Sequence, residues 1–167
     1  VARELFEAQL MQTDPNFANY RWQASTGRIV LLDFGAAREV SNAISQDYRR
    51  LLSAGLAEDR EDVMTAAIEA GFVNPRALDR HPEAMQKAVD IAVTQMARPE
   101  PLDFGDRAFV PEIRETVMPI AQDRDSWHLP PAETLFVQRK ISGTALLGAR
   151  LKARVDVRGI VQRILDQ

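Results

Sequence analysis

Three side chains near the start of the sequence have the types and spacing needed to bind a metal–nucleotide complex. Asp14 is followed five residues later by Asn19, and Asp33 opens an Asp-Phe-Gly tripeptide that ends at Gly35. Transfer of a phosphoryl group spreads negative charge that magnesium ions must neutralise, while another group orients the attacking hydroxyl. Mg²⁺ takes oxygen ligands, which carboxylates and amides supply. The pattern therefore predicts phosphoryl transfer from a nucleotide bound to Mg²⁺.

Each of the three residues has an expected role. In protein kinases an Asp takes or aligns the proton of the nucleophile, and the metal ligands are an Asn five residues later and the Asp of Asp-Phe-Gly. Asp14 matches the catalytic position, and Asn19 and Asp33 match the metal and cofactor ligands in the same order. A competing interpretation makes Asp14 and Asn19 turn or cap residues. The presence of Asp33 downstream favours the site.

A short β-hairpin is expected to bring these side chains together. Residues 19–23 predict a strand, 24–27 a turn and 28–32 the return strand, which would fold Asp33 back towards Asp14. The apolar run 29–32 predicts a buried strand that supports the carboxylate rigidly. A second Asp-Phe-Gly at Asp103 lies among prolines with no Asp and Asn upstream at the right spacing, so we interpret Asp103 as a turn residue.

Helical periodicity dominates the rest of the sequence. One helix is predicted after Gly35, and a second begins at a cap, Asp59, and ends at a left-handed stop, Gly71. A break is predicted at Asn74-Pro75. Further helices are predicted over 82–97, 110–122, 131–153 and 157–165. Gly143 and Gly148 would permit a close helix contact. The prediction is a mainly α fold, the C-terminal lobe of a protein-kinase-like fold, as one domain over 1–167: residues 1–40 carry the catalytic loop, one small hairpin and the metal loop, and 41–167 are helical.

Composition excludes several classes of function. The chain has 167 residues, 46% of them hydrophobic and 27% charged, as in ordinary globular proteins. A formal charge of −3 without a basic run argues against nucleic-acid binding, and the lack of cysteine excludes disulfides and thiolate metal sites. No signal peptide or long apolar run is present, so we expect a cytoplasmic location. His81 and His128 are interpreted as surface or cap histidines.

The end of the sequence is basic. From Thr134 onwards there are seven Lys or Arg and two Asp. These cations could touch anionic lipid headgroups peripherally at a membrane, or they could be the solvated faces of two helices. Both interpretations stay open at this point.

Three segments resemble a known family. The runs QTDPNFANY, LLDFGAAR and PPAETLFVQRKISGTALLGARLKA are similar to the C-terminal lobe of the UbiB/ADCK (AarF-like) atypical kinases. The resemblance covers the whole chain and is strongest over 11–38. It implies that Asp14 is the catalytic-loop Asp and that Asn19 and Asp33 are magnesium ligands. It also implies ATP binding, ATPase activity, a role in ubiquinone biosynthesis, and contact with a prenyl lipid or a membrane.

The sequence departs from ordinary protein kinases in two ways. Gln12-Thr13 stands where kinases have His-Arg, and no Ala-Pro-Glu follows Asp33, so a platform for peptide substrates is not expected. The nucleotide loop and its Lys–Glu pair would precede Val1 in a missing N-terminal lobe, so residues 1–167 alone are expected to be inactive. Two alternatives remain: a pseudokinase-like module that binds nucleotide and regulates, and a small-molecule phosphotransferase. The oligomeric state is not predicted.

Overall fold

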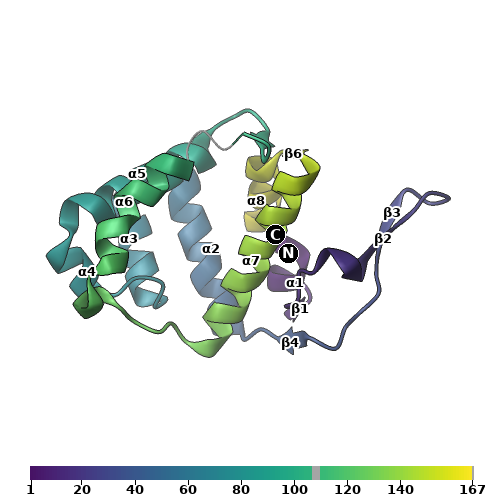
Figure 1. The fold of residues 1–167 in the computed structure, drawn as a ribbon, viewed down its shortest axis with the longest axis horizontal. Helices are drawn as coiled ribbons and strands as arrows, with labels where there is room; N and C mark the ends of the chain where they lie inside the picture. The colour runs from purple at the N-terminus through teal and green to yellow at the C-terminus, as the bar shows by residue number, and fades with distance from the viewer. Residues whose placement is uncertain (107–109, 167) are drawn as a thin grey trace.

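The computed structural model describes residues 1–106 and 110–166, most of which lie in helices (Figure 1). This confirms the prediction of a mainly α fold. The longer helices are α2 Asn42–Leu56, α3 Arg60–Glu69, α5 Pro82–Ala97, α6 Val110–Gln122, α7 Ala132–Leu151 and α8 Val157–Leu165. The shorter ones are α1 Ala2–Phe6, α4 Pro75–Arg80 and the 3-10 turns η1 Phe17–Asn19 and η2 Arg124–Ser126. The division at residue 40 stays a prediction.

The described strands form three antiparallel pairs. β2 Tyr20–Gln23 pairs with β3 Arg28–Leu31 as the predicted hairpin. The other pairs are β1 Leu10–Gln12 with β4 Ala37–Glu39, and β5 Leu102–Asp103 with β6 Arg154–Val155. The sequence predicted only one hairpin. The additional strands have two or three residues each, which is too short to leave an alternating pattern.

Strand β3 is exposed, which corrects the prediction that residues 29–32 are buried. Ile29 is 65% exposed and Leu32 is 55% exposed. The hairpin extends away from the helices (Figure 1), so its apolar side chains are not covered by them. β-branched residues favour a strand locally, but burial depends on which element packs against it.

A compact core supports the segment that leads into the predicted catalytic loop. Met11 of β1 is fully buried, and Leu5 of α1 and Val137 of α7 pack in the same cluster. Val40, which directly follows β4, completes the cluster together with Ile44 and Tyr48 of α2. Burial raises the pKa of Tyr48 to about 12. The predicted catalytic loop therefore follows directly on a well-packed core, to which α7 from the C-terminal part of the sequence contributes.

Polar side chains determine where several helices begin. Asp59 accepts a hydrogen bond from the backbone N–H of Asp62 at 3.0 Å, as its predicted role as a cap requires. Asn74-Pro75 was predicted as a break but starts α4 instead. The Asn74 side chain accepts from the Arg76 N–H, and proline fits the first helical turn. The left-handed stop at Gly71 is confirmed by its φ of 71°.

A charged cluster joins α4 to η2. Asp123 accepts hydrogen bonds from the Arg80 guanidinium at 3.0 Å and from the Ser126 hydroxyl at 2.8 Å, and its carboxylate lies 2.8 Å from His81 Nε2. Arg80, followed by Ser126, holds the pKa of Asp123 well below its usual range. His81 lies at the cap position between α4 and α5, but its side chain contacts Asp123 and makes no capping hydrogen bond.

Asp123→Asn is expected to lower the thermal unfolding temperature of the protein at neutral pH. Because the pKa of Asp123 is depressed in the folded state, its charge stabilises the fold above about pH 4, the usual pKa of Asp, and this contribution disappears as the pH falls through the folded-state value. Thermal unfolding at pH 7 and pH 3 measures the effect. The difference in unfolding temperature between the wild type and the variant should be largest at pH 7 and smaller at pH 3, where part of the contribution remains because the folded-state pKa lies still lower. A difference that is the same at both pH values would contradict this prediction.

Candidate active site

Asp14 and Asn19 lie in the loop between β1 and β2 and contact each other. The Asn19 side-chain amide donates a hydrogen bond to Asp14 Oδ2 at 3.0 Å, and its nitrogen is 3.4 Å from the Asp14 carbonyl oxygen. The turn between them starts at Asn16, whose side chain accepts from the Ala18 N–H and begins η1. The loop thus closes on itself and brings these two predicted site residues together.

Backbone hydrogen bonds on both sides of Asp33 tie it to this loop. The Leu32 N–H donates to the Asn19 carbonyl at 2.9 Å. Both the N–H and the hydroxyl of Thr13 donate to the Ala36 carbonyl, at 3.0 and 2.8 Å. The Asp33 carboxylate itself accepts from the Gly35 N–H at 2.8 Å, and in the described chain it makes no direct hydrogen bond to Asp14 or Asn19. The third predicted residue therefore neighbours the Asp14–Asn19 pair without joining it.

Pairing of β1 with β4 sets the spacing between the loop and the Asp-Phe-Gly segment. Met11 pairs with Arg38, and Gln12 with Ala37. The Arg38 guanidinium then lies 4.2 Å from the centre of the Phe136 ring on α7. Arg38 thus braces this segment against a helix about a hundred residues further along the chain.

Helix α7 forms a wall of the site, and its glycines admit loop residues. A Cβ atom at Gly143 would lie 2.7 Å from Pro15 Cβ, and one at Gly148 would lie 2.9 Å from the Phe104 ring. Both distances are too short for a side chain, so glycine is needed for the close approach. This corrects the prediction of a close helix–helix contact: both glycines face loops.

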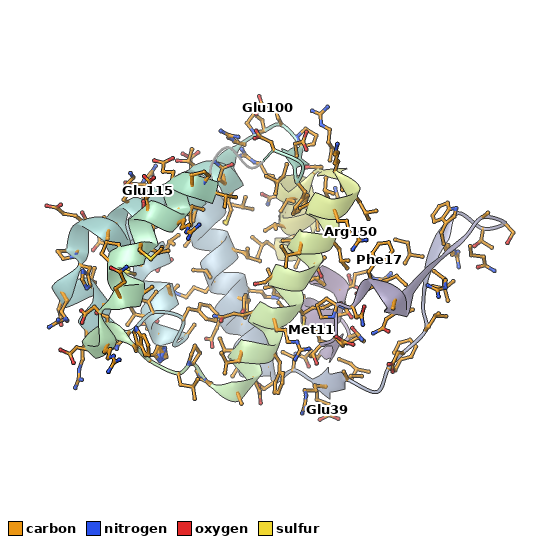
Figure 2. All side chains as sticks on the ribbon, viewed as in Figure 1. Met11, Phe17, Glu39, Glu100, Glu115 and Arg150 are labelled. Carbon is orange, nitrogen blue, oxygen red and sulfur yellow. The ribbon has the colours of Figure 1, made fainter. Side chains whose placement is uncertain are left out.

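Two arginines of α7 reach the loop and were not predicted as site residues. Arg139 Nη2 is 3.7 Å from Asp14 Oδ1, and its side chain is 64% exposed. The Arg150 guanidinium lies 5.2 Å from the Phe17 ring centre, and Figure 2 shows these two side chains next to each other. From the sequence, Arg139 and Arg150 were assigned only to the basic C-terminal segment. No local pattern could have connected positions so far apart.

The oxygen atoms of the three predicted site residues are suitable ligands for a hard cation. Asp14 and Asp33 supply carboxylate oxygens, and Asn19 turns its amide nitrogen towards Asp14, which leaves its oxygen as an acceptor. Mg²⁺ is bound by few protein ligands together with water and phosphate oxygens. Among the described residues, no three His, Cys, Asp or Glu side chains form a metal cluster. A magnesium ion here would therefore need the Asn19 amide and oxygens from its nucleotide as well.

The second Asp-Phe-Gly has the same local turn in different surroundings. Asp103 Oδ1 accepts from the Gly105 N–H at 2.8 Å, as Asp33 does from Gly35. Asp103 thus makes the predicted turn contact, but it is also the last residue of the short strand β5, which corrects the prediction of a loop without a strand. Its neighbour across the β5–β6 pair is Arg154, whose Nε is 3.9 Å from the Asp103 carboxylate. The tripeptide alone therefore specifies a turn, and its neighbours decide what the turn can do.

Comparison with known proteins gives a consistent result. Residues 1–67 match the model of the ABC1 atypical kinase-like domain. The mitochondrial atypical kinase COQ8 of Schizosaccharomyces pombe is 32% identical over 165 residues, which cover 98% of this chain and 27% of that protein. The mitochondrial atypical kinase COQ8B of Rattus norvegicus is 32% identical over 160 residues, or 96% and 30%. COQ8 of Saccharomyces cerevisiae is 30% identical over 167 residues, or 96% and 32%. The chain thus spans about a quarter to a third of the length of these relatives.

Proposed function

Because this chain belongs to the UbiB/ADCK family of atypical kinases, we propose that it carries the catalytic and metal loops of an ATP-dependent kinase or ATPase. In this proposal Asp14 orients the attacking group, while Asn19 and Asp33 hold Mg²⁺ and its nucleotide. The hydrogen bond from Asn19 to Asp14 at 3.0 Å is the observation that supports it most directly. It joins the first two predicted residues inside one loop. The two ends of this loop, Thr13 and Asn19, form hydrogen bonds with Ala36 and Leu32, which lie on either side of Asp33.

The surroundings of Asp14 suit a group that accepts a proton or aligns a nucleophile. Its Oδ2 accepts from Asn19, which limits rotation of the carboxylate, while its Oδ1 faces Arg139. A bound magnesium ion would neutralise charge on the phosphates. The contribution of this chain is then to hold the carboxylate of Asp14 in one orientation and to place Arg139 where negative charge gathers.

The acceptor is proposed to be water or a small molecule of prenyl-lipid metabolism, with a role in ubiquinone biosynthesis. The names of these relatives describe atypical kinases and place those proteins in mitochondria. In this chain Gln12 and Thr13 are buried where ordinary kinases carry His-Arg, which does not favour a peptide substrate. The cytoplasmic location expected from the sequence stays a prediction. Within the described residues, no helix has the length and apolar character to span a bilayer.

A regulatory module that binds nucleotide without turnover is the second candidate. It is favoured by the Asp33 carboxylate, which bonds to its own turn instead of to Asp14 or Asn19 in the described structure. This candidate needs the same three side chains for binding but no phosphoryl transfer. Turnover therefore distinguishes the two functions, whereas nucleotide affinity does not.

The test is ATP hydrolysis by the full-length protein with Mg²⁺, compared with its Asp14→Asn variant. Loss of a positioned acid–base group should lower the turnover rate by about 100-fold. Binding of a fluorescent ATP analogue should remain within a few-fold of the wild type, because Asp14 is not a proposed metal ligand. Wild-type protein that binds the analogue but shows no magnesium-dependent hydrolysis would support the regulatory module instead.

A further inference from the structure

Lys140 of α7 is a buried cation that the proposed chemistry does not use. It is only 3% exposed, although lysine is rarely buried without a partner. Its ammonium lies 3.4 Å from a carboxylate oxygen of Glu4, 3.4 Å from Gln12 Oε1 and 3.4 Å from the Tyr20 hydroxyl. These partners belong to α1, β1 and β2. One side chain from the C-terminal part therefore contacts three separate N-terminal elements.

Two of the partners of Lys140 stand at the ends of the proposed catalytic loop. Gln12 is the last residue of β1 and precedes Thr13 and Asp14, whereas Tyr20 is the first residue of β2 and follows Asn19. The same ammonium therefore contacts the residue before the loop and the residue after it. Glu4 adds a further connection, because it also accepts a hydrogen bond from the Gln12 N–H at 3.2 Å.

The chemistry of lysine fits this place. An ammonium has three donors and no acceptor, and each of the three partners here offers an oxygen. Stability alone does not explain why this ion pair is present, because well-packed apolar residues can often replace a buried ion pair without loss of stability. The geometry therefore points to a role in fixing the loop. The neighbouring Arg139 is exposed and faces Asp14 directly, so the two adjacent cations have different surroundings.

We propose that Lys140 is a positioning residue that holds the two ends of the 13–19 loop together and thereby sets the distance between Asp14 and Asn19. It acts through Gln12 and Tyr20 and touches neither of the two site residues. Its expected effect on turnover rests on the proposed function, whereas its effect on the loop does not. The two effects can therefore be measured separately.

The experiment compares Lys140→Met with the double variant Glu4→Gln/Lys140→Met in the full-length protein. The single variant removes the ammonium beside the partly buried carboxylate of Glu4, which keeps its hydrogen bond from the Gln12 N–H, and should unfold at a lower temperature. The double variant removes both charges but keeps an acceptor for the Gln12 N–H, so its unfolding temperature should return towards that of the wild type. Lys87→Met is the matched control, because Lys87 pairs with Glu112 at 3.4 Å with both side chains more than half exposed.

Hydrogen–deuterium exchange of the loop decides the proposal without any nucleotide. In the double variant, amides of residues 13–19 should exchange about tenfold faster than in the wild type, while those of α3 stay unchanged. Magnesium-dependent hydrolysis should stay at least about tenfold below the wild type, with a higher half-saturating Mg²⁺ concentration. Unchanged loop exchange in the stable double variant, or activity that returns together with stability, would overturn the proposal. Wild-type protein without hydrolysis would overturn the proposed function instead, and the exchange result would still stand.

Discussion

Asp33→Asn is expected to lower magnesium-dependent ATP hydrolysis by the full-length protein by about 1,000-fold, the equivalent of about 4 kcal/mol of transition-state stabilisation. An asparagine has nearly the same size and can still accept from the Gly35 N–H, so the turn should persist. The lost charge is the one proposed to hold Mg²⁺. Initial rates over a range of Mg²⁺ concentrations measure the effect, and excess Mg²⁺ should restore only part of the activity.

The second Asp-Phe-Gly supplies a matched control for this variant. Asp103→Asn makes the same chemical change in a turn with the same hydrogen bond, at 2.8 Å, but away from Asp14 and Asn19. Its hydrolysis rate should stay within about twofold of the wild type, as for most substitutions outside a site. Equal rates for Asp33→Asn and the wild type would remove Asp33 from the mechanism. Equal losses in both variants would show that the turn matters more than the metal ligand.

Leu5→Ala is expected to destabilise the fold by about 3 kcal/mol, within the range measured for leucine truncation in cores. Leu5 is 2% exposed and packs with Met11 and Val137, so truncation leaves a cavity between α1, β1 and α7. Because Met11 leads directly into the proposed catalytic loop, hydrolysis should also become more sensitive to temperature. Urea unfolding followed by circular dichroism, together with rates at several temperatures, measures both effects.

Leu146→Ala on α7 is the control for this core variant. Its side chain is 66% exposed, so the same chemical truncation should change stability by less than about 0.5 kcal/mol. If both leucine variants lowered the free energy of unfolding by the same amount, the cluster of Leu5, Met11 and Val137 would not be the main support of the N-terminal segment.

Local patterns predicted most helices well. The predicted ranges 82–97, 110–122 and 157–165 coincide with α5, α6 and α8. These segments combine helical periodicity with nearby prolines or polar caps, and such signals act within a few residues of the chain. The hairpin was also found, since its strands are separated by a turn of four residues. The start of α4 was missed because the pair Asn74-Pro75 serves equally well as a break and as a cap.

Long-range contacts account for the predictions that were wrong or incomplete. The burial of residues 29–32 was wrong because strand propensity does not specify a covering element. Gly143 and Gly148 were expected to face a helix, but they make room for Pro15 and Phe104. Arg139 and Lys140 carried no signal beyond their charge, although one faces Asp14 and the other lies beneath its loop.

The sequence by itself determined the types and order of Asp14, Asn19 and Asp33, and the local turns that bear them, because these depend on residue chemistry and short-range hydrogen bonds. Only the tertiary structure decided which distant side chains surround the loop. Helix α7 comes to lie against Pro15 and Gln12 through packing of the core, to which α1, β1, α2 and α7 all contribute. Such packing is a cooperative property of the whole fold and leaves no trace in the spacing of residues along the chain.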